Sequence, residues 1–536
     1  MAANDFLRNL GFDDDPFAST NAETEKRLAE YFVPPPYFAS VMGDPENPQS
    51  HIVFAPRGGG KTAQRRMIED EAATSGTFLC ITYDRFDLDP AAGLEQVSLQ
   101  YHLTNVCRLM LVGVLVTLDA FPDLVGLLTE HQKSVLKFQI ERFLGSLSSQ
   151  EFETATRTLK NLGDKVKDFW DTYGGPITPL INALTRKLGL EDVASPGGVA
   201  SSVVKDEPLA YHLKQLAEIV QQIGYSSTYV LVDRVDEVPV AAKDASSTFR
   251  LISPLLLDLP TLETPGIAFN FFMWDQIADL YAENGGRPDR ITVSKLKWAV
   301  AELQEMLRQR LNVYSSGGVA SMNEVLCEPE LDVHQLVAYL AAGSPRDMIR
   351  FAQRMVAEET RTAQTSPCLS NASIWGGAAV FARERANELF GTKYIAELAK
   401  VGKPTFTINE LANDIFKVNQ QSARSKVQNW TNTGLVAKIG ELANPGKKPL
   451  HLYGVADVRL ALAMLPAPEA EFVLGNYAFA CRWCDFVCIS DKPTIRCLKC
   501  LAEFDPKRSL SLLEVCSNEP WRYIRQSRRR RDNGAR

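Results

Sequence analysis

The stretch Ala55-Pro56-Arg57-Gly58-Gly59-Gly60-Lys61-Thr62 decides the fold of this chain. A short apolar run at residues 51–55 precedes it, and residues 62–73 follow with helical spacing. Residues 78–83 are a second apolar run, rich in β-forming side chains. The order strand, glycine loop, helix, strand predicts a βαβ unit and therefore an α/β core with a parallel sheet.

The glycine loop has the residues that a phosphate-binding loop needs. Consecutive glycines let backbone N–H groups surround phosphates, a lysine reaches the terminal phosphates, and a hydroxyl binds Mg²⁺. These roles fall to Gly58, Gly59, Gly60, Lys61 and Thr62, with Arg57 as a further nucleotide contact. Ala55 stands where G-x-x-x-x-G-K-[ST] has its first glycine, which restricts the turn. The alternative is a glycine-rich turn with a chance Gly-Lys-Thr.

A second motif lies far along the chain, where four apolar residues at 229–232 lead into acidic side chains. Such a run predicts a buried strand that delivers carboxylates to the carboxyl edge of the sheet, where open α/β sheets bind ligands. We expect Asp233 to hold Mg²⁺ through water, and Asp236 or Glu237 to orient and deprotonate an attacking water. The alternative is a solvated acidic turn. Together the two motifs predict ATP and Mg²⁺ as cofactors and ATP hydrolysis as the reaction.

Length and composition describe a multidomain globular chain. At 536 residues, with 45% apolar and 23% charged side chains, it is long enough for three or four units. The start lacks the basic and apolar segments of a secretory signal. The longest apolar stretch, residues 109–118, is shorter than the roughly 20 residues of a membrane span. We therefore expect a cytoplasmic protein with no membrane segment, and a buried helix at that stretch.

The chain divides by sequence pattern into six parts. Residues 1–50 are expected to form a lead-in segment packed on the first domain, and residues 51–296 the ATPase core, with a helical insertion at about 88–204. In that insertion Phe152, Ala155, Leu159, Leu162, Val166 and Phe169 recur at helical spacing. Loop residues 194–202 close it. Residues 297–400 are expected to be a helical lid, 401–466 a winged helix, 467–512 a zinc ribbon and 513–536 a basic tail.

The paired motifs resemble those of the AAA+ and STAND branches of P-loop ATPases. The spacing Asp233, Asp236, Glu237 is similar to that of STAND-type switches and their KAP relatives, which also have a long insertion between the motifs. The resemblance implies that Asn270 is a sensor-1 residue near the γ-phosphate. It also implies that Arg346, in Gly-Ser-Pro-Arg, is the sensor-2 arginine of the lid. We expect the chain to be a homo-oligomer when nucleotide is bound. Arg287 or Arg290 would then be a finger that reaches a neighbour's nucleotide, with a solvated surface arginine as the alternative.

Residues 407–455 have the pattern of a winged helix, which origin-recognition-type AAA+ proteins also place after the lid. In its second helix, residues 420–433, Val427 and Trp430 are expected to face the core. The side chains expected to reach duplex DNA are Gln421, Arg424, Lys426 and Asn429, with Lys447 and Lys448 on a phosphate. Packing against protein alone is the alternative.

Two cysteine pairs near the C-terminus predict a structural zinc site. Cys481 and Cys484 form one C-x₂-C knuckle, and Cys497 and Cys500 form the other, twelve residues on. Two such knuckles complete a tetrahedron of thiolates around Zn²⁺. Cys488 is a competing ligand that fits neither knuckle. The four scattered cysteines, Cys80, Cys107, Cys327 and Cys368, do not make the disulfide framework of a secreted protein.

The net charge of −7 argues against general coating of nucleic acid, so contact with a polyanion is expected to be local. Residues 522–536 hold seven arginines and one acid, a composition that suits nucleic-acid contact or a solvated tail. The function expected is an ATP-hydrolysing switch or motor that couples ATP to DNA or a partner protein, in DNA transactions or in bacterial defence against phage. The alternative is a nucleotide-gated interaction scaffold or sensor with little or no hydrolysis, whose helical insertion contacts a protein partner.

Overall fold

The computed structural model of the chain describes residues 2–88, 93–144 and 207–518, apart from residues 243, 364–365, 447, 493 and 506–508. Between residues 145 and 206 it describes residues 153, 159, 162–173, 182–183 and 185–190. The chain forms two compact units. One comprises residues 34–297, and the other comprises residues 1–33 together with residues 298–536.

A five-stranded parallel sheet forms the centre of the unit at residues 34–297, in the order β2-β3-β4-β1-β5. The strands are β1 (His51–Ala55), β2 (Phe78–Tyr83), β3 (Ser227–Val232), β4 (Ile267–Trp274) and β5 (Thr292–Lys295). Strands β1, β2 and β3 cover the apolar runs that the sequence marks as strands, and the predicted parallel α/β core is confirmed. Strands β3 and β4 lie between β1 and β2, although β1 and β2 are consecutive in the chain.

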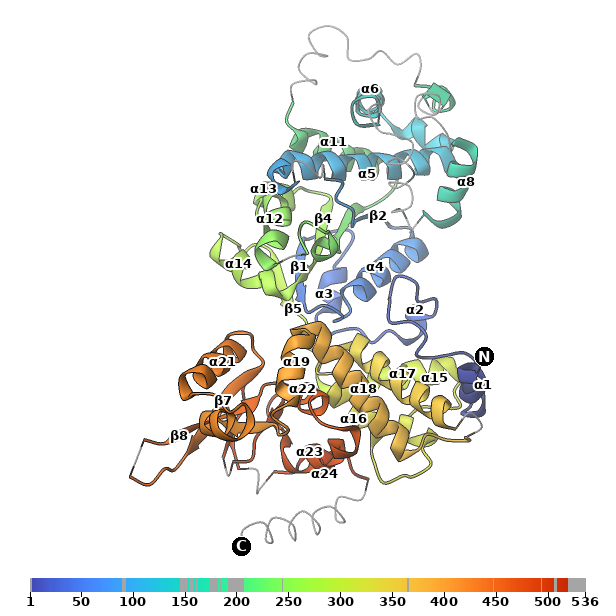
Figure 1. Ribbon diagram of the computed structural model, residues 1–536. Coiled ribbons are helices and arrows are strands. Elements are labelled where there is room, and N and C mark those ends of the chain that lie inside the picture. The colour runs from blue at the N-terminus through green and yellow to red at the C-terminus, as the bar shows by residue number, and fades with distance from the viewer. Residues whose placement is uncertain are drawn as a thin grey trace. The chain divides into compact units, whose positions relative to one another are not determined.

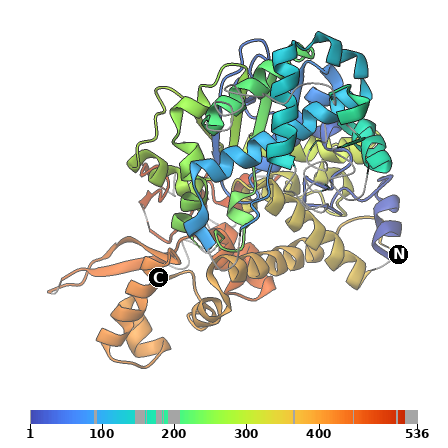
Figure 2. The ribbon, with the colours of Figure 1, turned by 90° about the horizontal axis from the view of Figure 1, so that it is seen from above.

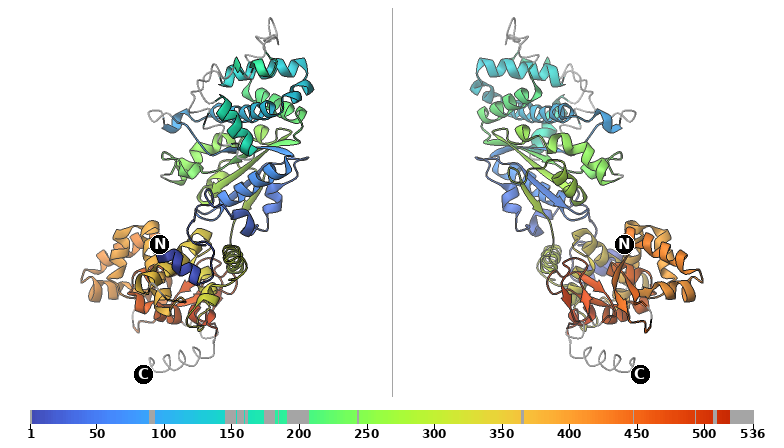
Figure 3. Two further views of the ribbon diagram at one scale, coloured as in Figure 1. Left: turned by 90° about the vertical axis from the view of Figure 1, so that its right-hand side faces the viewer. Right: turned by 90° about the vertical axis from the view of Figure 1, so that its left-hand side faces the viewer.

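Helices cover both faces of this sheet (Figures 1 and 3). Successive side chains of a strand point to opposite sides of the sheet, so the apolar strands give both faces an apolar surface. Val53 and Leu231 pack with Ile68 of α4 (Lys61–Ser75) on one face, near α3 (Phe38–Met42). Ile52 and Val230 belong to the larger core on the other face. That core includes α5 (Leu99–Ala120), α11 (Leu209–Gln222) and α12 (Ala245–Leu256).

Helix α5 is the one helix among the described residues that is long and apolar enough to cross a membrane. Its 18-residue apolar window is 72% buried within the protein, and α5 packs on α11, α8 (Gly163–Tyr173) and β2. At Gly113 a Cβ atom would lie 3.1 Å from Leu79 Cδ1, so the glycine permits this close approach. The expected buried helix at residues 109–118 is thus a core helix.

Further helices surround these elements. They are η1 (Gly93–Gln96), η2 (Pro122–Leu127), α6 (Glu130–Gln139), η3 (Ile140–Leu144), η5 (Val235–Glu237), α13 (Leu259–Leu262), η6 (Asp275–Ile277) and α14 (Ala278–Glu283). Of the spaced apolar residues expected in the insertion, Leu159, Leu162 and Phe169 are buried in the core and Val166 packs against it. Phe152, Ala155 and the loop at 194–202 lie outside the described residues.

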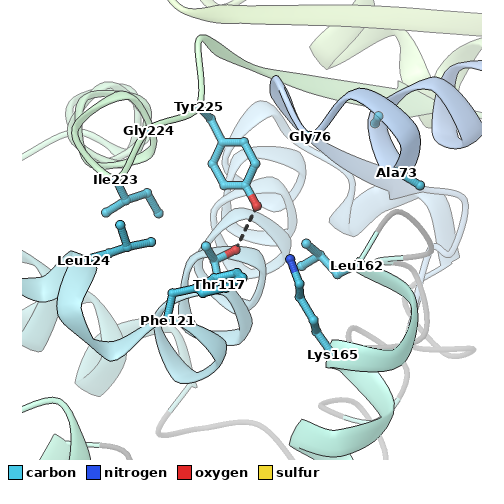
Figure 4. A pocket seen from close by; sticks show the side chains of 11 residues that line it. Ala73, Gly76, Thr117, Phe121, Leu124, Leu162, Lys165, Ile223, Gly224 and Tyr225 are labelled. Carbon is cyan, nitrogen blue, oxygen red and sulfur yellow. Dashed lines mark hydrogen bonds between the residues drawn. The ribbon is translucent and has the colours of Figure 1, made fainter.

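A pocket of about 210 Å³ lies at the C-terminal end of α4 (Figure 4). Thr117 and Tyr225 share a hydrogen bond of 3.1 Å in its wall, and Lys165 Nζ lies 4.4 Å from the centroid of the Phe121 ring. Because α4 rises about 1.5 Å per residue, its 15 residues separate this pocket from the glycine loop by roughly 20 Å. The pocket is therefore distinct from the loop at the start of α4.

The second unit begins with an all-helical part. Its helices are α15 (Val300–Tyr314), η7 (Met322–Val325), α16 (Val333–Leu340), α17 (Pro345–Thr362), α18 (Asn371–Phe390) and α19 (Thr392–Ala399). A disulfide joins Cys327 to Cys368, which the sequence did not predict. Backbone hydrogen bonds between Cys327 N and Leu369 O (2.9 Å) and between Leu369 N and Val325 O (2.8 Å) align the two segments beside it.

Residues 1–33 belong to this second unit and residues 34–50 to the unit of the sheet, so the lead-in segment expected at residues 1–50 is divided between the two units. Residues 1–33 include α1 (Ala2–Asn9) and α2 (Leu28–Tyr31). The buried guanidinium of Arg310, on α15, donates to Glu25 at 2.7 Å, to Ser19 O at 3.1 Å and to Tyr31. A buried charge needs such partners, so Arg310 ties the segment to α15.

Residues 405–455 form the predicted winged helix. Strands β6 (Thr405–Thr407), β7 (Val436–Leu442) and β8 (Leu450–Val455) make an antiparallel sheet in the order β6-β8-β7. The helices are α20 (Ile408–Glu410), continued by η8 (Leu411–Ile415), and α21 (Gln420–Asn432). Figure 2 shows the β7–β8 hairpin, in orange, projecting beyond its helices as a wing. Val427 and Trp430 are buried as expected.

The cysteine-rich module consists of two short antiparallel ribbons. One pairs β9 (Ala478–Ala480) with β10 (Val487–Ile489), and the other pairs β11 (Ile495–Arg496) with β12 (Glu503–Phe504). Helices α22 (Val458–Ala463), η9 (Ala467–Glu469), α23 (Ala470–Asn476) and α24 (Leu512–Val515) flank it. The basic residues at 522–536 lie outside the described residues.

Candidate functional site

The glycine loop connects the end of β1 to the start of α4. Gly58 and Gly60 have φ angles of 78° and 98°, a region that favours glycine. At Gly59 a Cβ atom would lie 2.9 Å from Pro56 O, so a side chain would collide with the backbone. Ala55 is the last residue of β1, and its φ angle is not positive. An alanine in place of glycine is therefore compatible with the loop.

Lys61 is positioned within this loop. Its side chain is buried, and Nζ donates to Ala55 O at 3.2 Å and to Pro56 O at 3.4 Å. Gly60, the N-cap residue of α4, has no side chain to cap the first-turn N–H groups of the helix. The ammonium and the positive helix end therefore make a site for an anion such as a phosphate group.

Thr62 and Asp233 join the glycine loop to the acidic motif. Thr62 Oγ1 donates to Asp233 Oδ2 at 3.0 Å, across 171 positions of sequence. Asp233 directly follows β3 and is 1% exposed. A hydroxyl and a carboxylate at the carboxyl edge of the sheet are hard oxygen donors, which Mg²⁺ prefers together with phosphate oxygens. The donor set therefore fits the magnesium ion that the sequence predicts.

The two remaining acids of the motif have different surroundings. Asp236 is buried, with Arg57 Nε donating to its Oδ2 at 2.8 Å and Arg57 Nη2 donating to its backbone oxygen at 2.9 Å. The Glu237 side chain is 54% exposed and pairs with Arg234 at 2.7 Å. Asp236 is thus held against the glycine loop, whereas Glu237 is held toward solvent by Arg234.

Asp275 is an acid at this edge that the sequence analysis missed. It directly follows β4, as Asp233 follows β3. Burial raises the pKa of Asp275, the charge of Lys61 opposes that rise, and the charge of Asp236 adds to it. Its carboxyl group is therefore within electrostatic range of both. The sequence pattern that could have identified Asp275 is an acid directly after an apolar run, which is the pattern that identified Asp233.

Asn270 does not lie at this edge, which contradicts its expected sensor-1 role. In the sheet it pairs with His51 at the start of β1, whereas Trp274 pairs with Ala55 beside the loop. Four residues of strand separate these levels by roughly 13 Å. Asn270 is fully buried and its Nδ2 donates to Val41 O at 3.0 Å. Trp274 is the β4 residue at the site, with its ring centroid 4.3 Å from the guanidinium carbon of Arg57.

The candidate finger arginines lie just before β5. The first residue of β5 pairs with His51, the first residue of β1, at the amino-terminal ends of the strands and away from the glycine loop. Arg287 pairs with Asp289 at 2.6 Å and Arg290 with Glu263 at 2.7 Å. Both are exposed. Their ion-pair partners are thus outside the site of Lys61 and Asp233. Their action on the nucleotide of a neighbouring subunit stays a prediction.

Arg346 is the second residue of α17, in the other unit. It is exposed, and Ser344 and Pro345 begin the helix as the Gly-Ser-Pro-Arg pattern suggests, with the Ser344 hydroxyl accepting from Asp347 N at 3.2 Å. Its sensor-2 role stays a prediction.

The four knuckle cysteines meet at one point. Their Sγ atoms all lie within 4.8 Å of one another, with Cys481 and Cys500 at 3.5 Å and Cys484 and Cys497 at 3.6 Å. Zn–S bonds of about 2.3 Å in a tetrahedron place sulfurs about 3.8 Å apart, so the group fits Zn²⁺. Burial tends to raise the pKa of Cys497, but hydrogen bonds from the backbone N–H groups of Cys500 and Lys499 and from the thiols of Cys484 and Cys500 together lower that pKa to about 7. Cys488 lies in β10, outside the group.

The outer face of α21 holds the side chains expected to contact DNA. Gln421, Arg424 and Asn429 are exposed, as is Lys448 on the wing. Lys426 is held within the unit, 3.0 Å from Glu397 and over the ring of Phe416. Lys447 lies outside the described residues. Arg424 is therefore the cation of this helix best placed to reach an external anion.

No family model matches the sequence, and no curated protein matches it significantly. Among solved structures, the chain is similar to the ORC1 protein of Aeropyrum pernix in complex with DNA, with 12% identity and a TM-score of 0.35. The match covers 83% of this chain and 96% of that one. The ORC2 protein of Aeropyrum pernix, in ADPNP and ADP complexes, has 13% identity and a TM-score of 0.34, with the same coverage. Cdc6p of Pyrobaculum aerophilum has 11% identity and a TM-score of 0.31, covering 83% and 94%.

Proposed function

We propose that this protein is an ATPase of the AAA+ type that couples ATP binding and hydrolysis to the binding of DNA or a partner protein. The observation that carries the proposal is the hydrogen bond between Thr62 and Asp233, because it brings the two sequence motifs to one edge of one sheet. A glycine loop without an adjacent acid would only bind an anion. A loop with Asp233 and Asp236 beside it has the groups for hydrolysis.

In this mechanism the backbone of residues 57–60 and Lys61 bind the β- and γ-phosphates. Thr62 and Asp233 would hold Mg²⁺, which neutralises charge that develops on the phosphate oxygens. Asp236 orients a water molecule and accepts its proton. Arg57 now neutralises Asp236, so Asp236 becomes a base only when the guanidinium turns to another anion. The incoming phosphates are such an anion, since Arg57 is a residue of the loop that binds them.

The DNA-binding part of the proposal rests on the winged helix. An exposed helix face with Arg424, next to a projecting wing with Lys448, suits a duplex groove and its phosphates. We propose duplex DNA as the partner of this face and of the basic residues at 522–536. The further proposals are a structural zinc ion, nucleotide-dependent self-association, a protein partner on the helical insertion, and work in the cytoplasm in DNA transactions or phage defence.

A second candidate function is a nucleotide-gated scaffold or sensor with little or no hydrolysis. The observation in its favour is that both acids that can activate water are ion-paired, Asp236 with Arg57 and Glu237 with Arg234. If these pairs persist with ATP bound, the carboxylates of Asp236 and Glu237 stay engaged by arginines and are not positioned to take a proton from water.

Steady-state ATP turnover of the pure protein, with and without duplex DNA, separates the two functions. The ATPase predicts measurable turnover that DNA increases. Tight ATP binding with no turnover under either condition would favour the scaffold. No ATP binding at all would contradict both.

A further inference from the structure

Arg65 is a fully buried arginine on the first turns of α4, one helical turn after Lys61. Its position is unfavourable for a cation, because the N-terminal end of a helix carries partial positive charge and the neighbouring Lys61 is also positive. Burial of a guanidinium costs several kcal/mol unless charged partners surround it. The partners of Arg65 therefore indicate its role.

Two carboxylates engage Arg65 from different elements. Arg65 Nε donates to Asp233 Oδ2 at 3.1 Å, and Nη1 donates to Glu69, one turn further along α4. Thr82, on β2, also donates to Glu69. The side chains of Arg65, Asp233 and Glu69 are all at most 4% exposed. A buried chain of contacts thus runs from β2 through α4 to the acid after β3.

This chain of contacts leaves Asp233 little rotational freedom. Asp233 Oδ2 accepts from Thr62 Oγ1 and from Arg65 Nε, and Oδ1 accepts from the backbone N of Arg234 at 2.9 Å. A carboxylate offers about four acceptor positions, so these contacts among the described residues occupy three of them. One position remains for the water shell of a cation.

We propose that Arg65 is a positioning residue for magnesium: with Glu69 behind it, it fixes the Asp233 carboxylate in the orientation that receives a magnesium-bound water next to Thr62. The inference rests on the proposed function and deepens it, since it concerns the same site. Arg65 itself touches neither nucleotide nor metal. It acts through Asp233, so its loss changes the response to Mg²⁺ more than the binding of nucleotide alone.

Arg65→Lys is the main test because it keeps the charge. An ammonium cannot reproduce the fixed two-directional geometry by which the guanidinium reaches both carboxylates. The readout is binding of a ribose-labelled fluorescent ATP to the full chain, first in EDTA and then across a MgCl₂ titration. We expect the Mg²⁺ concentration at half-effect to rise about tenfold, while the dissociation constant in EDTA stays within about twofold of wild type.

Two further proteins complete the experiment. The double variant Arg65→Gln/Glu69→Gln removes the Arg65–Glu69 pair without leaving Glu69 as a buried unpaired charge, and it should also raise the Mg²⁺ requirement. Arg250→Lys is the matched control, because Arg250 is an exposed arginine of the same unit whose partner is the exposed Glu95. It should behave as wild type.

An unchanged or lowered Mg²⁺ requirement in both Arg65 variants would overturn the inference. Loss of affinity in EDTA to the same extent as in Mg²⁺ would also overturn it, because a merely structural role predicts that result. If wild type itself bound no labelled ATP, the proposed function would fail instead. The two failures are thus distinguishable.

Discussion

Asp236 and Glu237 are neighbours in the chain, and only one of them faces the nucleotide site. The difference comes from two arginines. Arg57, 179 positions away in sequence, holds Asp236 against the glycine loop, and Arg234 holds Glu237 from within the same turn. Sequence spacing left both acids as candidates for the base, because it contains no information on which partner each acid meets.

The first prediction is that Asp236→Asn lowers ATP turnover by about 100-fold, while Glu237→Gln stays within about threefold of wild type. Loss of a positioned general base lowers the rate of hydrolysis by about this factor. Glu237 is more than half exposed, so its substitution should have little effect. Turnover at saturating Mg-ATP measures both. The reverse order of effects would assign the base to Glu237.

Asn270 shows where residue-level prediction fails. Asn270 lies on β4, but a sensor residue near the γ-phosphate must lie at the end of that strand. The strand runs on to Trp274, so Asn270 lies four residues too early. The end of a strand is set by where its neighbours end, and those neighbours are distant in sequence.

At the scale of elements, local motifs were the most predictable features. Each zinc knuckle places both of its cysteines within one tight turn, and the two knuckles are only twelve residues apart, so spacing alone predicted that all four thiols meet. The disulfide between Cys327 and Cys368 had no such signal. Its cysteines are 41 positions apart and are brought together by the packing of the helical part.

The second prediction is about one zinc ion per chain by metal analysis, lost on Cys497→Ser. Four thiolates at tetrahedral spacing bind Zn²⁺ strongly, and three do not complete the site. Cys488→Ser is the matched control, since Cys488 lies in the same module but outside the four-thiol group, and it should retain the metal. Zinc-free wild-type protein would contradict the assignment.

The third prediction concerns the disulfide. Cys327→Ser/Cys368→Ser should destabilise the helical part by about 2 to 4 kcal/mol, because the cross-link restricts the unfolded chain. Thermal unfolding with and without reductant measures this, and reductant should leave the double variant unchanged. Titration of the thiols in denatured, unreduced, zinc-free protein should give eight; a count of ten would show that the bond does not form.

At the scale of the whole molecule, the sequence predicted the strands but not their arrangement. Strands β1, β2 and β3 are runs of buried, mostly apolar residues, a local property that sequence carries. The order β2-β3-β4-β1-β5 depends on pairs such as His51 with Asn270 and Phe78 with Ser227, which are distant in sequence. The placement of residues 1–33 with the second unit likewise depends on Arg310, nearly 300 residues away from its partners.

The fourth prediction is that Arg424→Ala weakens binding of duplex DNA and reduces the slope of log affinity against log salt by about one. An arginine that neutralises a phosphate releases about one counterion on binding. Arg308→Ala, an exposed arginine on α15 paired with Glu305, is the control and should leave both quantities unchanged. Equal weakening by the two substitutions would assign the effect to general charge.

The central claim is that the loop at residues 55–62 and the acids at residues 233–237 form one Mg-ATP site. Calorimetric titration of ATP in the presence of Mg²⁺, into wild type and Lys61→Ala, tests it most directly. We expect one site per chain in wild type and an affinity lower by about 100-fold in the variant, roughly 3 kcal/mol, as loss of a charged hydrogen-bond donor implies. Equal ATP affinity in the two proteins would contradict the claim.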